Sequence, residues 1–306
     1  MTVTAGETGD EGAPGFFRRN RMPRLIVGVV ISVVLIVAYL FGIQSYRAGL
    51  AQALPDQSPP TGGVSVVIVP ERVSPNEQEL PAQVLLFPAP ELLDAAGLLT
   101  QELEVRVQPA LSGQTLTFPA GEPTAPQSVV LPAAGTVQEY PFDTYAVNAD
   151  VQVHSLFADS YTPIPRQASL FFRVPGWSAG DTTVDAATAT GTTLSTELSR
   201  DGSTKSIALL LLLLMVILAV IAILVTGSAT RGRMKLELSV ASWMTALLFA
   251  LVPLRGFFPG DPPLGSWMDI LVFFWVELIL MLSVAAVVTT ILMRASDARH
   301  HPHENG

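Results

Sequence analysis

The sequence predicts a membrane protein with four transmembrane α-helices and an extracytoplasmic all-β, sandwich-like domain between the first and second of them. Composition is the first observation: 49% of the 306 residues are hydrophobic and only 14% are charged, against about 25% charged in soluble domains. The second is that four segments approach the roughly 20 apolar residues that a spanning helix needs. The third is an intervening stretch of short apolar runs between prolines and glycines, a pattern typical of β-sandwiches.

The first span is predicted at residues 25–43, after a cytoplasmic tail at residues 1–24 that is expected to be disordered. A cleaved signal peptide is the alternative, because Ala51-Gln52-Ala53 resembles a cleavage site. We favour an anchor, because an apolar stretch of about 19 residues exceeds the 7–15 of a signal peptide. Prolines and glycines in residues 44–63 indicate a linker.

The β-rich domain is predicted at residues 64–205. Glu102–Gln108 and Thr144–Ser155 alternate strictly between apolar and polar side chains, which marks half-buried strands. A short helix is expected at Glu91–Gly97. Further strands are expected at Val64–Val69, Gln83–Phe87, Thr115–Phe118, Ser128–Leu131, Ser169–Val174, Thr182–Ala187 and Leu194–Leu198.

The later spans are predicted at residues 206–226, 238–254 and 270–293. A cytoplasmic loop at 227–237 and an outer loop at 255–269 join them, and a cytoplasmic tail follows at 294–306. Basic residues flank the spans on the side of the two tails and the 227–237 loop. The positive-inside rule therefore predicts a multi-pass plasma-membrane protein with both termini in the cytoplasm.

The chain is acidic, with 17 Lys+Arg, 26 Asp+Glu and a net charge of −9. On the predicted topology the outer pieces hold 19 of the acids and eight of the basic residues. This balance argues against a nucleic-acid partner, because phosphate binding needs a basic surface. The absence of cysteine excludes disulfides and thiolate metal sites, and we expect no cofactor.

Glu277 is the first candidate for a functional residue, because a carboxylate within a span costs roughly 2.5–3.5 kcal/mol on insertion scales. Pairing the third and fourth spans brings Thr245 and Ser242 near its depth, and both can donate a hydrogen bond to it. A proton or cation site is the functional interpretation. A hydrogen-bonded clamp between two helices is the simpler one.

The outer loop is the second candidate. Its three prolines and its glycines predict a fixed turn, in which Arg255 forms an ion pair with Asp261 or Asp269. The loop is then able to dock on the outer domain. The simpler interpretation is a helix hairpin in which Asp269 caps the fourth span.

The third candidate is the string Tyr140, Pro141, Phe142 and Asp143. It resembles the loop at the membrane-facing end of the extracellular sandwich in pentameric ligand-gated channels, where that loop touches the membrane domain. Those receptors carry all four spans after the sandwich, whereas here one span precedes it. An aromatic corner between two strands is the simpler interpretation.

The predicted layout occurs together with that string and with a second motif near the end of the chain, Pro253-Leu-Arg255, Pro259-Gly-Asp-Pro-Pro-Leu-Gly265, Asp269 and Trp275-x-Glu277. The combination resembles an actinobacterial family of membrane proteins of unknown function, typical of mycobacteria and their relatives. The resemblance implies a plasma-membrane protein. It supplies no activity, substrate or catalytic residue.

Three functional hypotheses follow. The favoured one is a non-enzymatic envelope protein that lies in the lipid bilayer and binds a protein, glycan or lipid partner through its acidic outer domain. The second is a channel or transporter subunit that uses Glu277. The third is an outer-facing hydrolase or transferase that uses carboxylates. A homo-oligomer remains an open alternative.

Overall fold

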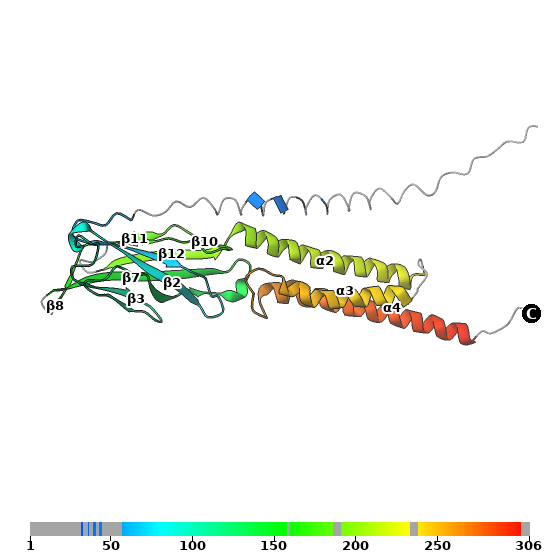
Figure 1. The fold of residues 1–306 in the computed structure, drawn as a ribbon. Helices are drawn as coiled ribbons and strands as arrows, with labels where there is room; N and C mark the ends of the chain where they lie inside the picture. The colour runs from blue at the N-terminus through cyan, green and yellow to red at the C-terminus, as the bar shows by residue number, and fades with distance from the viewer. Residues whose placement is uncertain are drawn as a thin grey trace, which may run out of the picture.

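The computed structural model describes residues 57–157, 160–185, 191–232 and 238–300, together with isolated helical positions between residues 32 and 44. Within these residues a β-sandwich-like region is followed by three long helices that extend from one of its ends (Figure 1). Most of the predicted first span and of the linker, the 1–24 tail, and parts of the 227–237 loop and of the C-terminal tail lie outside the described residues.

The smaller sheet has four strands in the order β5 (Gln127–Pro132), β2 (Glu79–Pro88), β1 (Val64–Pro70) and β9 (Arg166–Leu170). The pairs β5–β2 and β2–β1 are antiparallel, whereas β1 and β9 run parallel. The sheet therefore joins the start of the domain to a strand about 100 residues further along the chain.

The larger sheet has a central path of five strands, β10 (Trp177–Ala179), β12 (Thr192–Arg200), β7 (Thr144–Phe157), β3 (Glu102–Gln108) and β4 (Thr115–Phe118). Three short strands extend it: β11 (Thr183–Asp185) pairs with β12, while β6 (Ala134–Gly135) and β8 (Ser160–Pro163) pair with β7. Two single turns of 3-10 helix, η1 (Pro90–Leu92) and η2 (Val137–Glu139), complete the region.

The apolar faces of the two sheets form the core of the sandwich. The apolar face predicted for β3 is confirmed, because Leu103, Val105 and Val107 are fully buried, whereas Glu104 of the predicted polar face is buried as well. The alternating face of β7 is confirmed as well, with Tyr145, Val147, Ala149, Val151 and Val153 all buried. Strict alternation therefore identified the two strands at the centre of the larger sheet.

Two of the predicted elements differ from the structure. The helix expected at Glu91–Gly97 is wrong: only Pro90–Leu92 is helical, because the Asp94 carboxylate accepts hydrogen bonds from the backbone of Ala96 and Leu98 and closes a turn instead. The strand expected at Ser169–Val174 lies earlier, at β9, where pairing with β1 sets its register.

The three helices are α2 (Gly202–Thr230), α3 (Leu238–Gly256) and α4 (Phe274–His300), which a π-helical turn, η3 (Asp269–Phe273), precedes. Each is long and apolar enough to cross a membrane, which indicates a membrane protein. α4 packs against both α2 and α3 (Figure 1). Its buried seam repeats every three or four residues, at Val276, Leu280, Ser283 and Val287.

α2 buries mainly small side chains, Ala208, Ala219, Ala222 and Ala229, together with Met215. Small residues let two helix backbones approach closely, and van der Waals packing then holds the helices together in lipid. At the far end of the bundle Arg294 of α4 donates a hydrogen bond to the carbonyl of Ala229, 3.1 Å away. The two helices are therefore joined at a terminal carbonyl as well as along the seam.

Candidate functional site

β12 passes into α2 without a linker. Arg200 ends the strand and Asp201 caps the helix, since its Oδ1 accepts the Thr204 backbone N–H at 2.7 Å. The Asp201 backbone N–H and the Thr204 hydroxyl both donate to the carbonyl of Gly176, at 3.0 and 3.1 Å. The first turn of α2 is thus fixed to the turn that leads into β10.

Arg200 lies at the centre of the junction between sandwich and helices. Its side chain is 2% exposed, and its Nε lies 3.2 Å from both carboxylate oxygens of Asp143, which is fully buried. The guanidinium also stacks over the ring of Trp177, 4.1 Å from its centroid, and lies 5.1 Å from that of Tyr140. A buried charge is tolerated only when it is paired in this way.

Tyr140 connects the sandwich to the loop between α3 and α4. Its hydroxyl donates to the carbonyl of Pro259 at 2.9 Å, and its ring packs edge-on against Phe258. Burial raises the pKa of the Tyr140 phenol, which keeps this donor protonated. The next residue of the loop, Gly260, lies so close to Arg200 that an added Cβ would come within 2.0 Å of its Nη1.

The Tyr140–Asp143 string therefore meets the loop between α3 and α4 at two points. Tyr140 contacts it directly, and Asp143 does so through its partner Arg200, which lies against the loop. Pro141 and Asp143 are buried, whereas Phe142 is 58% exposed. Burial raises the pKa of the Tyr145 phenol, the Asp143 carboxylate adds to this effect, and Tyr145 packs edge-on against Trp177. The structure thus brings the string and the loop, two separate candidates in the sequence, into one cluster.

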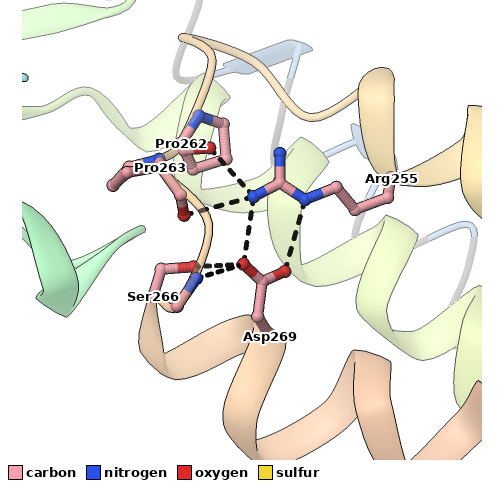
Figure 2. Close-up of polar contacts among 6 residues, drawn as sticks. Arg255, Pro262, Pro263, Ser266 and Asp269 are labelled. Atoms are coloured by element: carbon pink, nitrogen blue, oxygen red, sulfur yellow. Dashed lines mark hydrogen bonds and ion pairs between the residues drawn. The ribbon is translucent and has the colours of Figure 1, made fainter.

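The outer loop is closed by Arg255 and Asp269, as Figure 2 shows. The Nε and Nη2 atoms of Arg255 lie 3.3 and 3.0 Å from the two carboxylate oxygens of Asp269. Arg255 also donates to the carbonyls of Pro262 and Pro263, and Asp269 accepts the backbone N–H of Gly265 at 3.0 Å. Of the two partners considered for Arg255, the structure selects Asp269.

Asp269→Asn is expected to lower the free energy of unfolding by about 2–3 kcal/mol, because it removes the negative charge and leaves Arg255 with carbonyl partners alone. Asp261→Asn is the matched control: Asp261 is exposed and forms no ion pair among the described residues, so its change should stay within about 0.5 kcal/mol. Denaturation of the full chain in detergent measures both. Equal losses of stability in the two variants would contradict the assignment of Asp269 as the partner of Arg255.

Glu277 lies on α4 at the edge of its buried seam and is half-buried. It forms no hydrogen bond or ion pair with the residues that the structure describes. The Thr245 hydroxyl donates to the carbonyl of Ala241 on its own helix, and Ser242 is exposed. The predicted hydrogen bonds from Thr245 and Ser242 to Glu277 are therefore not formed.

His154 lies on β7, and its Nδ1 is buried without a partner among the described residues. Burial and the nearby Arg106 guanidinium lower the pKa of His154 from its ordinary 6.5, against a smaller opposing effect of Glu104. The folded state thus prefers the neutral imidazole.

The imidazole takes up its proton at a higher pH in the unfolded chain than in the folded one. The free energy of unfolding of the sandwich should therefore fall as the pH drops through about 6.5. Denaturation at pH values of about 7.5 and 5.5, compared between the native chain and His154→Gln, measures this contribution. The variant should lose less stability on acidification than the native chain. An identical loss in both would show that His154 does not contribute.

The sequence pattern does not single out two residues of the junction, Arg200 and Trp177. Arg200 is indistinguishable in sequence from a basic flank of the apolar α2, and Asp143 is 57 positions away. The one local signal was the capping pattern Asp201-x-x-Thr204, which marks the start of a helix directly after a strand.

The carboxylates buried in the described part of the chain are all paired with arginine. Asp143 pairs with Arg200, Asp269 with Arg255, and Glu104 of β3 with Arg106. Within the same residues, no group of three His, Cys, Asp or Glu side chains is placed to hold a metal ion. The arrangement at the junction can therefore hold two parts of the protein in a fixed relation.

Comparison with known proteins divides the chain at this junction. Residues 54–198 match the family described as Domain of unknown function (DUF4436), and residues 200–294 match Domain of unknown function (DUF8686). The two matches fit a family of unknown function. A search of curated proteins gave no match. The division lies at the end of β12, so Arg200 belongs to the helical match while Asp143 belongs to that of the sandwich.

Proposed function

We propose that this chain is a plasma-membrane protein that holds an acidic β-sandwich in a fixed orientation outside the cell, where the sandwich binds an envelope protein, glycan or lipid. The observation that carries the proposal is the junction, in which β12 continues into α2 and the Arg200–Asp143 pair is buried. A flexible tether would serve a domain that only has to stay near the membrane. Here the loop between α3 and α4 packs on the base of the sandwich, against Tyr140 and the ion-paired Arg200, and this contact fixes the direction in which the sandwich points.

The charge of the sandwich limits the partner. Residues 57–200 contain 15 Asp and Glu, five Arg and no Lys. A surface of this charge repels polyanions and attracts basic or cationic groups. The partner is therefore a basic or neutral molecule of the envelope.

The proposed topology has four spans, with residues 25–43 as the first and both termini in the cytoplasm. Its support is the placement of basic residues after α2 and in the last turns of α4, where the positive-inside rule expects them on the cytoplasmic side. The actinobacterial family that the sequence resembles fits this layout.

The absence of cysteine makes the topology directly testable. In Tyr161→Cys the thiol lies in β8, at the end of the sandwich away from the helices, and a membrane-impermeant maleimide should label it in intact cells (Figure 1). In Thr230→Cys the thiol lies at the end of α2 and should react only after permeabilisation. The reverse pattern would contradict the proposed orientation.

Binding by the sandwich is tested by photo-crosslinking from exposed positions in native membranes. We expect envelope components that are captured by the native chain and captured at least about threefold less when Glu71, Glu91 and Glu122, all exposed, are changed to glutamine. Changing the exposed Gln138 and Asn148 to serine is the control, and it should leave capture unchanged. Capture of no envelope component would contradict the proposed function.

A second candidate function, a channel or transporter subunit, is favoured by Glu277 alone. Its neighbours along the exposed flank of η3 and α4 are the apolar Ile270, Phe274 and Met281, so the carboxylate lies within an apolar stripe. Carboxylates in spans often mark proton or ion pathways. If this function holds, Glu277→Gln abolishes ion or proton flux into proteoliposomes while Met281→Gln does not. No flux with the native chain would reject it.

A further inference from the structure

Four exposed apolar side chains lie where the sandwich meets the helices, and we call them the apolar collar: Phe142, Phe257, Leu264 and Trp267. They are 58, 73, 83 and 52% exposed. Phe142 comes from the sandwich and the other three from the loop between α3 and α4. The Tyr140–Pro259 hydrogen bond and the close approach of Gly260 to Arg200 hold these two parts together.

The start of α2 shows how far the collar lies from the hydrocarbon core. Residues 202–206 form a polar first turn, and the exposed apolar surface of the helix begins at Ile207. Five residues of helix rise about 8 Å. The headgroup layer on each side of a bilayer is about 5–8 Å thick. The base of the sandwich, at Arg200, therefore reaches the headgroup layer.

The collar continues the apolar surface of the spans into this layer. Below it, η3 exposes Ile270 and Leu271, and α2 exposes Ile207. Aromatic rings collect at the level of the headgroups, because one part of this environment is apolar and another is wet.

We propose that the apolar collar lies in the outer headgroup layer, so that the sandwich rests on the lipid bilayer through Phe142. The occupant of this surface is lipid because the collar is continuous with the surface of the three candidate spans. The inference rests on the proposed membrane-spanning role of α2 to α4. It adds a lipid contact made by the sandwich itself.

Depth-dependent fluorescence quenching tests this inference in proteoliposomes. The cysteine-free chain allows one bimane label at a time, in Phe142→Cys, Tyr161→Cys or Leu278→Cys. Tyr161 is the matched control, since it is an exposed aromatic residue of the sandwich near the opposite end of β7. Leu278, exposed on α4, reports whether the helices are inserted.

We expect lipids with a nitroxide on the headgroup to quench the label at position 142 at least about twice as strongly as the label at 161. Lipids with a mid-chain nitroxide should quench the label at 278. Equal, weak quenching at 142 and 161 with strong quenching at 278 would overturn the collar alone. Weak quenching at 278 would overturn the proposed spans themselves. A label at 142 that is shielded from iodide but not quenched by either lipid would assign the surface to a protein instead.

Discussion

Replacing Arg200 with methionine should lower the free energy of unfolding by about 3–5 kcal/mol, the largest effect we expect from a single change. Methionine replaces the aliphatic stem of arginine but leaves the fully buried Asp143 carboxylate without its partner. It also removes the stacking of the guanidinium on Trp177. Denaturation in detergent, followed through the near-ultraviolet circular dichroism of the aromatic side chains, measures the loss.

The double variant Arg200→Met, Asp143→Leu separates the charge from the packing. Replacing both members of a buried ion pair with apolar residues is often neutral or stabilising. We therefore expect the double variant to return to within about 1 kcal/mol of the native chain. Should Arg200→Met alone be as stable as the native chain, the ion pair would not be what holds the junction.

Gly260→Ala should lower the free energy of unfolding by about 2–4 kcal/mol, the second large effect. Two causes add. Gly260 has a φ of +78°, which disfavours any side chain, and an added Cβ would lie 2.0 Å from the Nη1 of Arg200. The change is in the loop between α3 and α4, yet we expect it to displace Arg200 at the base of the sandwich.

Gly256→Ala is the matched control in the same segment. Gly256 ends α3, has no positive φ, and an added Cβ would meet nothing within 4 Å. The control should change stability by less than about 0.5 kcal/mol or raise it slightly. The same denaturation measurement applies. Equal free energies of unfolding for the two variants would show that the loop does not pack closely against Arg200.

The parts of the fold that depend on local pattern were predictable from the sequence. The alternation of β3 and β7 predicted the central strands, and apolar length predicted the three described helices. The sequence also predicted an ion pair for Arg255 within the short loop that joins two helices, although the choice of Asp269 over Asp261 came from the structure. In each case the interacting groups are near in sequence, or a periodic pattern reports their burial.

The junction itself was not predictable in the same way. Nothing in the sequence near Arg200 shows that it is buried, since its partners Asp143 and Trp177 reach it only through the pairing of β7 and β10 with β12. The Tyr140–Asp143 string pointed to the correct end of the sandwich, but only through a resemblance. The sequence showed that Glu277 is a carboxylate within a predicted span. The direction of its side chain depends on the packing of α4 against two helices and could not be predicted.

We expect the sandwich and the helices to move as a single body in the membrane. The distance between nitroxide labels at Glu197→Cys on β12 and Leu278→Cys on α4, measured by pulsed electron resonance in lipid nanodiscs, tests it most directly. We predict a distance distribution as narrow as that of a pair within the sandwich, Glu197→Cys with Thr117→Cys, and broadening when Arg200→Met is added. A broad distribution in the otherwise native chain would contradict the claim.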